Sequence, residues 1–345
     1  MLQIPATILT GFLGAGKTTL LKRLLEEPHG QRLAIIENEF GEENIDKEFL
    51  VTRSEEQIYQ MSNGCICCSI RQDLREALLL LAEKKKQGEL AFDRIVIETT
   101  GLADPGPVAQ TFFADPAVAG LYLLDSIVTV VDARHAPQQL DKRQEASRQV
   151  GFADRLFISK SDLVSAGELR QLQERLGRIN RRAPQKLLHH GKLDFTAFFD
   201  VRGFSLDAIL DIDPTLLPLA APVEHPGASL ACARPHVHDE HCGHHHHDAV
   251  SSFVFRSARA FEPEPLQRFL AALVERHGPQ LLRYKGILAV SGFDRKFIFQ
   301  GVHQIMGSTI GPRWKDDETR ESRLVFIGID LPRAEIEAGL DDCLA

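Results

Sequence analysis

The sequence lacks the features that mark membrane-spanning and secreted proteins. Its first apolar run, Ile4–Thr10, is far shorter than the about 20 residues that a transmembrane helix needs, and no basic, cleavable leader precedes it. Six cysteines in 345 residues are too few for a disulfide framework, and three of them are crowded together. We therefore expect a cytoplasmic protein without a membrane partner, whose clustered cysteines bind metal or carry thiol chemistry.

Excess positive charge is absent as well. The chain has 40 lysine and arginine residues against 48 aspartate and glutamate residues, so its formal net charge is −8. Such a chain offers no broad basic surface to displace the counterions of a nucleic acid, and we expect no nucleic-acid partner. The contents of 43% hydrophobic and 26% charged residues are typical of globular proteins, and the length suits two domains.

Residues 1–210 alternate apolar strands with helices. The predicted strands are Ile4–Thr10, Leu33–Glu37, Arg94–Glu98, Ile127–Asp132 and Arg155–Ser159, and the predicted helices are Lys17–Glu27 and the regions near 70–86, 138–150 and 166–179. Nearly continuous apolar strands separated by helices indicate an α/β domain with a mainly parallel sheet and helices on both faces. Ligands of such sheets bind at the carboxyl ends of the strands.

The rest of the chain divides into a linker and a smaller second domain. Residues 211–249 are rich in proline and histidine and show neither a helical nor a strand period, which predicts a linker. Residues 250–345 are predicted to form an α+β domain with a mainly antiparallel sheet. Its predicted strands are Ser251–Phe255, Gly286–Val290, Lys296–Gly301 and Arg323–Ile329, and its predicted helices are Pro265–Arg276 and Ala334–Leu340.

A phosphate-binding motif directly follows the first predicted strand. Gly11 to Thr18 reads Gly-Phe-Leu-Gly-Ala-Gly-Lys-Thr and matches G-x-x-x-x-G-K-[ST] at every fixed position, which predicts a P-loop NTPase. The glycines let backbone N–H groups surround a phosphate, Lys17 should reach the β- and γ-phosphates, and the Thr18 hydroxyl should coordinate Mg²⁺. The residues predicted to bind the nucleotide here are Gly11, Gly14, Ala15, Gly16, Lys17, Thr18 and Thr19.

Two later strand ends complete the predicted nucleotide site. Glu98 ends the third strand and should hold Mg²⁺ through water, while Gly101 should approach the γ-phosphate. Ser159-Lys160-Ser161-Asp162 resembles the base-reading [NT]-K-x-D motif of GTPases. There Asp162 would accept both donors of guanine, and Lys160 would lay its aliphatic stem along the base. Serine in the first position departs from the commonest form, so ATP stays an alternative to GTP.

Three thiols within four residues form a predicted metal site. Cys65, Cys67 and Cys68 stand just before a predicted helix, whose N-terminus favours the thiolate. Two of them, with a ligand from elsewhere, suit tetrahedral Zn²⁺, with Co²⁺ or Ni²⁺ as competitors; buried structural cysteines or a redox pair are the alternatives. Glu37 and Glu42, in the acidic stretch after the second strand, are candidates for the outside ligand or, for Glu42, for positioning the attacking water. A solvated acidic loop is the alternative there.

The histidine-rich part of the predicted linker is a second candidate for metal binding. Neutral imidazoles bind Zn²⁺ well near physiological pH, so the tract either captures metal or serves as a polar spacer. The candidate ligands are His236, His238, His241, His244, His245, His246 and His247.

Together these motifs resemble the CobW-like GTPases. The likeness looks closest to the YjiA-type branch of that family. It rests on Thr10–Leu21, Glu37–Glu42, Asn63–Cys68 and Gly101–Pro107, and on Leu282–Gly286, which resembles the C-terminal domain of the family.

The resemblance implies a slow GTPase of the class that includes nickel and cobalamin metallochaperones. It implies Lys17 and Thr18 for phosphate and Mg²⁺, Glu98 for the Walker-B role and the Cys65–Cys68 segment for metal. It also implies the insertion of zinc, cobalt or another metal into a client protein, which the sequence does not identify. Whether identical chains assemble into an oligomer is left open.

The nucleotide and the metal are expected to influence each other. Mg-GTP should order the Glu37–Glu42 and Cys65–Cys68 segments at one sheet edge and tighten the metal site, and hydrolysis should release the metal. Two other functions are compatible with the motifs. One is a small-molecule kinase, and the other is a metal-storage or metal-sensing protein with incidental nucleotide binding.

Overall fold

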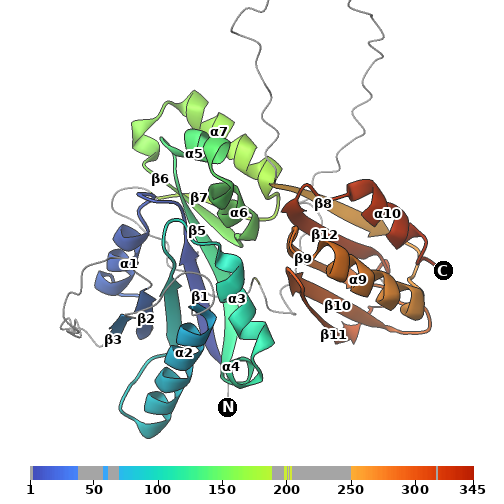
Figure 1. Cartoon of the computed structure of the whole chain (residues 1–345), viewed down its shortest axis with the longest axis horizontal. Coiled ribbons are helices and arrows are strands. Elements are labelled where there is room, and N and C mark those ends of the chain that lie inside the picture. Colours follow the sequence, from blue (N-terminus) through green and yellow to red (C-terminus); the bar gives the residue numbers. More distant parts are fainter. Residues whose placement is uncertain are drawn as a thin grey trace, which may run out of the picture.

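The computed structural model describes residues 3–37, 57–60, 70–188, 198–199, 201, 203, 250–315 and 318–345. They form an N-terminal body and a smaller C-terminal body that lie side by side (Figure 1). Within these residues no helix combines the length and the hydropathy needed to cross a membrane. The predicted linker, 211–249, lies outside the described residues, so its bounds stay a prediction.

A seven-stranded parallel sheet forms the centre of the N-terminal body. Its strand order is β3-β2-β4-β1-β5-β6-β7, and each neighbouring pair is parallel. The strands are β1 (Ile4–Thr10), β2 (Leu33–Glu37), β3 (Gln57–Gln60), β4 (Arg94–Glu98), β5 (Tyr122–Asp132), β6 (Arg155–Ser159) and β7 (Gln185–Leu187). The sheet confirms the predicted P-loop NTPase fold class.

Helices cover both faces of this sheet (Figure 1). Ile35 and Val96 pack with α1 in one hydrophobic cluster, whereas Ile36 and Ile97 pack with α2 and α3 in another, because alternate residues of a strand point to opposite faces. The helices of this body are α1 (Lys17–Glu26), α2 (Ile70–Gln87), α3 (Pro105–Ala114), α4 (Pro116–Leu121), α5 (Ala136–Lys142), α6 (Gln144–Phe152) and α7 (Ala166–Ile179).

Five-stranded antiparallel pairing confirms the predicted class of the C-terminal body. The strand order is β11-β10-β9-β12-β8. The elements are β8 (Val250–Ser257), α9 (Pro263–His277), β9 (Leu281–Leu288), β10 (Arg295–Val302), β11 (Ile305–Arg313), β12 (Ser322–Ile329) and α10 (Arg333–Asp341).

Several predicted bounds were wrong. The single helix near 138–150 is two helices, because Arg143 adopts an extended backbone (φ −135°, ψ 112°) that ends α5 and begins α6. The fourth predicted strand begins at Tyr122 rather than Ile127, and the strand predicted at Gly286–Val290 is β9. The strand β11 was not predicted at all, because its residues are mostly exposed and carry no apolar run.

The antiparallel sheet is buried on both faces, against different partners. In β12, Leu324 and Phe326 pack with α9 and α10, while Val325 and Ile327 join the hydrophobic cluster of the N-terminal body. The helix α6 contacts β8, β9 and β12. At Gly151 of α6, an added Cβ would come within 2.8 Å of Leu282 Cδ1. The two bodies therefore share one continuous apolar core.

A buried ion pair ties the central strands together at their amino ends. Arg94 of β4 is 1% exposed, and its Nη1 lies 2.8 Å from Asp125 Oδ2 of β5. The guanidinium spans β1, where the Thr7 hydroxyl lies 3.4 Å away, and its Nε donates to Gln31 Oε1 at 3.1 Å. It also lies over the Phe199 ring, 5.0 Å from the centroid.

We expect Asp125→Asn to lower the free energy of unfolding by about 3–5 kcal/mol, because it leaves the buried Arg94 guanidinium without the negative charge of its partner. The matched control is Asp93→Asn, which breaks the half-exposed pair with Arg32 and should cost about 0–1 kcal/mol. Urea unfolding followed by circular dichroism measures both. Equal losses in the two variants would contradict a central role for the buried pair.

Candidate functional site

The parallel register brings the chemistry-bearing strand ends to one edge of the sheet. Leu9 at the end of β1 pairs with Glu98 of β4, and Glu98 also pairs with Glu37 of β2. On the other side, Asp132 of β5 pairs with Ser159 of β6. The phosphate motif, the predicted Mg²⁺ ligand and the predicted base-reading motif therefore all begin at this edge.

The backbone of residues 11–16 has the shape that a phosphate-binding loop requires. Gly11, Gly14 and Gly16 have φ values of 142°, 73° and 101°, in the left-handed region that favours glycine. At Gly11 the approach of β5 is a second constraint, since a Cβ there would lie 2.3 Å from the Val130 carbonyl oxygen. The loop leads directly into α1, whose N-terminal N–H groups and dipole favour an anion.

Lys17 curls back over the loop that precedes it. Its Nζ donates to the carbonyl oxygens of Gly11, at 2.8 Å, and Phe12, at 3.4 Å. Burial lowers the pKa of the Lys17 ammonium, while the nearby Glu98 carboxylate acts in the opposite direction. The loop therefore holds the Lys17 ammonium close to the position that a bound phosphate would occupy.

Thr18 and Glu98 bring two oxygen donors together beside the loop. The Thr18 Oγ1 donates to Glu98 Oε1 at 3.1 Å. A hydroxyl and a carboxylate are the hard oxygen ligands that Mg²⁺ takes, directly or through water, when it also binds a nucleotide phosphate. This donor set fits the predicted Mg²⁺ site.

The segment after β4 lies against the phosphate loop. Thr99 N donates to Leu9 O at 2.9 Å, and at Gly101 a Cβ would lie 2.6 Å from the Leu13 backbone nitrogen. From α6, Gln149 Nε2 donates to Gly101 O at 3.1 Å and to Ala103 O at 3.0 Å. Gly101 therefore packs on the loop itself, and Gln149 holds that segment in place.

The predicted base-reading motif is tied to the same loop. Ser159 Oγ donates to Ala15 O at 2.6 Å, and Lys160 Nζ donates to Gly14 O at 2.8 Å. Lys160 has a left-handed backbone (φ 55°) and pairs with Asp132 Oδ2 at 2.6 Å. Burial would raise the pKa of Asp132, but hydrogen bonds from Lys160 and His135 hold it below its usual value. Asp162 follows as an exposed residue.

The predicted metal ligands lie mostly outside the described residues. This applies to Cys65, Cys67, Cys68, Glu42, His236, His238, His241, His244, His245, His246 and His247, and the structure describes only the backbone of Glu37. Within the part of the chain that the structure describes, no three His, Cys, Asp or Glu side chains are grouped so that they could hold a metal ion.

The described residues nevertheless bound the cysteine segment on both sides. It starts after Gln60, the end of β3, and finishes before Ile70, the start of α2. Gln60 pairs with Glu37, and Glu37 with Glu98. The acidic and cysteine segments thus both leave the sheet at the edge that carries Glu98.

Asp132 and Gln149 are site residues that the sequence analysis missed. Asp132 was assigned only as a strand end, although an acid at the carboxyl end of a strand beside β1 is a usable signal. No local pattern distinguishes Gln149, because its role comes from the packing of α6 beside the segment after β4.

Two domain families match the chain. Residues 5–186 match the CobW/HypB/UreG nucleotide-binding domain, and residues 250–344 match the cobalamin synthesis protein CobW C-terminal domain. The chain is 40% identical over 341 residues to the zinc chaperone YjiA of Escherichia coli K12, with 98% of each chain covered. It is 31% identical to the zinc-regulated GTPase metalloprotein activator 1 of Schizosaccharomyces pombe, covering 96% of this chain and 83% of the relative.

Solved structures agree with this match. The Zn(II)-bound YjiA GTPase from E. coli has a TM-score of 0.77 and 36% sequence identity, and the match covers 100% of both chains. A second Zn(II)-bound YjiA structure, of a triple mutant in which one glutamate and two cysteines are alanine, has a TM-score of 0.78 and 35% identity over 100% of both chains.

We expect Gly101→Ala to reduce nucleotide turnover by about 100-fold, because its Cβ collides with the backbone at Leu13 and displaces positioned phosphate-binding groups. Gly120→Ala is the matched control, since a Cβ at Gly120 meets nothing within 4 Å. Steady-state hydrolysis and nucleotide titration measure the effect. If both variants turn over nucleotide like the unaltered protein, Gly101 does not shape the loop.

Proposed function

The chain belongs to the CobW family of P-loop GTPases, and on that basis we propose that it hydrolyses GTP to control the binding and release of Zn²⁺. One observation carries the proposal. The register from Gln60 through Glu37 to Glu98 starts the acidic segment on the strand next to the carboxylate that accepts from Thr18, and the cysteine segment one strand further out. A nucleotide bound at the loop would therefore act on the start of the acidic segment and, through β2, on the start of the cysteine segment.

Phosphoryl transfer to water would rely on charge neutralisation by the loop. Lys17 leaves its carbonyl partners for the β- and γ-phosphates, and its ammonium balances the charge that develops on the transferred group. Mg²⁺ held by Thr18 and, through water, by Glu98 would supply further positive charge to the same oxygens. Glu42 is the proposed residue that orients the attacking water.

Guanine selectivity is proposed to rest on Lys160 and Asp162. The contacts of Lys160 to Gly14 and Asp132 place the stem of this side chain beside the phosphate loop. Asp162, an exposed residue, would accept from the ring N–H and the amino group of guanine, which adenine cannot offer as a pair. Ser159 stands where asparagine or threonine is usual, and its hydroxyl donates to the loop at Ala15.

The metal is proposed to be carried as cargo by thiolates. Cys65, Cys67 and Cys68 supply the sulfur ligands and Glu37 or Glu42 a further one, a set that suits Zn²⁺ and also accepts Co²⁺ or Ni²⁺. Zinc is favoured because the relatives named above are a zinc chaperone and a zinc-regulated GTPase metalloprotein activator.

The histidine tract is proposed to be an auxiliary metal-capture segment. The YjiA triple mutant that lacks one glutamate and two cysteines is still Zn(II)-bound, so zinc can bind that relative without those three side chains. For this chain the number of bound ions, rather than the presence of zinc, is therefore the informative quantity.

Release is proposed to deliver the metal to a client protein. The names of the relatives, chaperone and metalloprotein activator, both imply a recipient. Thermodynamic reciprocity requires that zinc also alters the affinity for the nucleotide, by the same factor.

We expect Lys17→Ala to lower GTP turnover by at least about 100-fold and to leave the fold intact, because it removes the cation that balances transition-state charge. Lys22→Ala, at an exposed position on the same helix, is the matched control and should behave like the unaltered protein. Phosphate release measures GTP turnover, and circular dichroism measures whether the fold is intact.

The unaltered protein should hydrolyse ATP far more slowly than GTP, and equal rates would contradict the guanine assignment.

We expect Zn²⁺ to bind about 5–150-fold more tightly to protein loaded with Mg²⁺ and a non-hydrolysable GTP analogue than to protein loaded with Mg-GDP. Calorimetric titration with a competing chelator measures both affinities. Cys67→Ser should remove the difference. Deletion of residues 225–247 should reduce the number of bound ions and leave the difference unchanged. Identical affinities in the two nucleotide states would exclude a switch and favour metal storage or sensing.

A further inference from the structure

The turn between β10 and β11 brings a histidine of the C-terminal body against the start of α3. At Gly106, the second residue of α3, an added Cβ would lie 2.6 Å from His303 Nε2 and 2.9 Å from Phe152 Cζ. The His303 and Phe152 rings pack edge to face, with 5.3 Å between their centroids. The strands β10 and β11 also contact α3. The imidazole therefore lies between the first turn of α3 and the end of α6.

The C-terminal body holds this histidine in a defined place. His303 has a left-handed backbone (φ 51°), which histidine adopts more readily than most residues. Its carbonyl oxygen and that of Ile305 both accept from the hydroxyl of the buried Tyr284, at 3.1 and 3.2 Å. Its Nδ1 lies 3.3 Å from the carbonyl oxygen of Gly278, just after α9. The turn therefore has a fixed base, and its histidine has little freedom to move when α3 presses on it.

The first turn of α3 is joined to the segment that packs on the phosphate loop. Asp104 caps α3, since its Oδ1 accepts from Gly106 N at 2.8 Å, and its Oδ2 lies 2.8 Å from Arg148 Nη1 of α6. Pro105 fixes the backbone φ at the first helical position. Because the chain from Gly101 to Gly106 is short and held at these points, a shift of α3 at Gly106 would also move Gly101.

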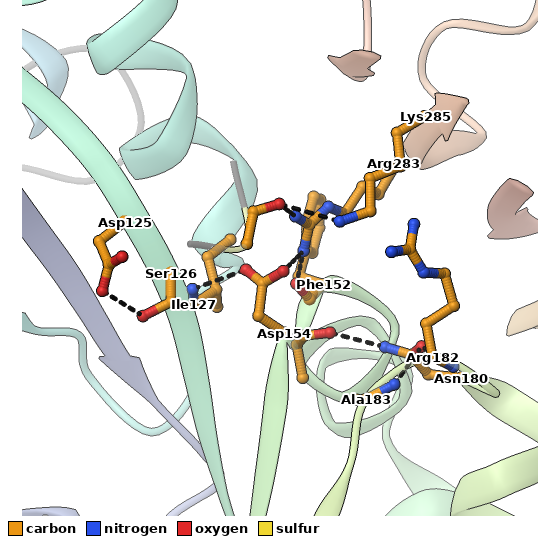
Figure 2. Close-up of polar contacts among 12 residues, drawn as sticks. Asp125, Ser126, Ile127, Phe152, Asp154, Asn180, Arg182, Ala183, Arg283 and Lys285 are labelled. Atoms are coloured by element: carbon orange, nitrogen blue, oxygen red, sulfur yellow. Dashed lines mark hydrogen bonds and ion pairs between the residues drawn. The ribbon is translucent and has the colours of Figure 1, made fainter. Parts of the chain in front are cut away.

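The helix α6 connects the same two places. Gln149 of this helix donates to the carbonyl oxygens of Gly101 and Ala103. At the end of the helix, the Phe152 carbonyl oxygen accepts from Arg283 Nη1 of β9 at 3.2 Å (Figure 2). The C-terminal body therefore contacts both helices that hold the segment at Gly101.

We propose that His303 is a positioning residue for GTP hydrolysis, which sets the place of Gly101 from the C-terminal body by way of Gly106. Gly101 is predicted to approach the γ-phosphate. Holding it in place therefore raises GTP turnover and has little effect on the binding of GDP, which has no γ-phosphate. The inference rests on the GTP hydrolysis of the proposed function and not on its metal cargo.

The test compares full-length His303→Gly with the unaltered protein. Glycine adopts the left-handed backbone without strain, so the variant removes the ring and preserves the turn. The matched control is Gln304→Gly, in the same turn, because Gln304 is exposed and packs on Gly278 of its own body. Phosphate release measures kcat for GTP, calorimetric titration measures the Kd for GDP, and thermal unfolding compares the stability of the two variants.

His303→Gly should lower kcat for GTP by about tenfold and leave the Kd for GDP within about twofold of the unaltered value. Gln304→Gly should leave both quantities unchanged. An unchanged kcat in His303→Gly, or a GDP affinity that falls as far as kcat, would overturn the proposal. Turnover by the unaltered protein tests the proposed function by itself, whereas this inference depends on the differences among variants.

A second pair of variants tests the contact directly. Gly106→Ala places a methyl group against the His303 ring and should also lower kcat. Combined with His303→Gly, the methyl group occupies space that the ring has left, so the double variant should turn over GTP at least as fast as His303→Gly alone. Losses that multiply independently would show that the two residues act separately, which contradicts the proposal.

Discussion

Parallel pairing across β2, β4, β1, β5 and β6 is the constraint on which the whole nucleotide site depends. Each strand contributes its carboxyl end to one edge, so residues far apart in sequence become neighbours there. Glu98 illustrates the effect, since it accepts from Thr18 and is in register with both Leu9 and Glu37. A one-residue slip would turn these side chains to the other face of the sheet. The buried Arg94–Asp125 pair joins β4 and β5 across β1, toward their opposite ends.

The second body shares the hydrophobic core of the first and places charge in the junction. Its sheet packs α9 and α10 of the same body on one face, and the other face packs on α6 of the N-terminal body. Within that apolar contact, four basic residues, Arg155, Arg182, Arg283 and Lys285, line a cavity beside Asp154. The same helix, α6, contacts the segment after β4 through Gln149, so the junction and the nucleotide edge have one element in common.

Much of the nucleotide site could be predicted because its signals are local. The glycines with left-handed backbone, the lysine and the threonine follow one another in eight residues, and their spacing alone specifies a loop that binds phosphate. Strand bounds such as Ile4–Thr10 were predicted correctly because buried parallel strands are continuous apolar runs. Helix bounds were less predictable. The break between α5 and α6 is a change of backbone angle at Arg143, and the spacing of hydrophobic residues does not indicate it.

By itself the sequence determined the phosphate loop, the α/β class, the order of two domains and the residue types available for metal. Each of these depends on interactions between residues close together in the chain. Only the tertiary structure showed that Asp132 and Gln149 support the nucleotide loop, that Ser159 braces Ala15, and that cations of two domains meet around Asp154. Those relations depend on strand register and domain packing. Both consist of contacts between residues far apart in the sequence, so no local sequence pattern indicates them.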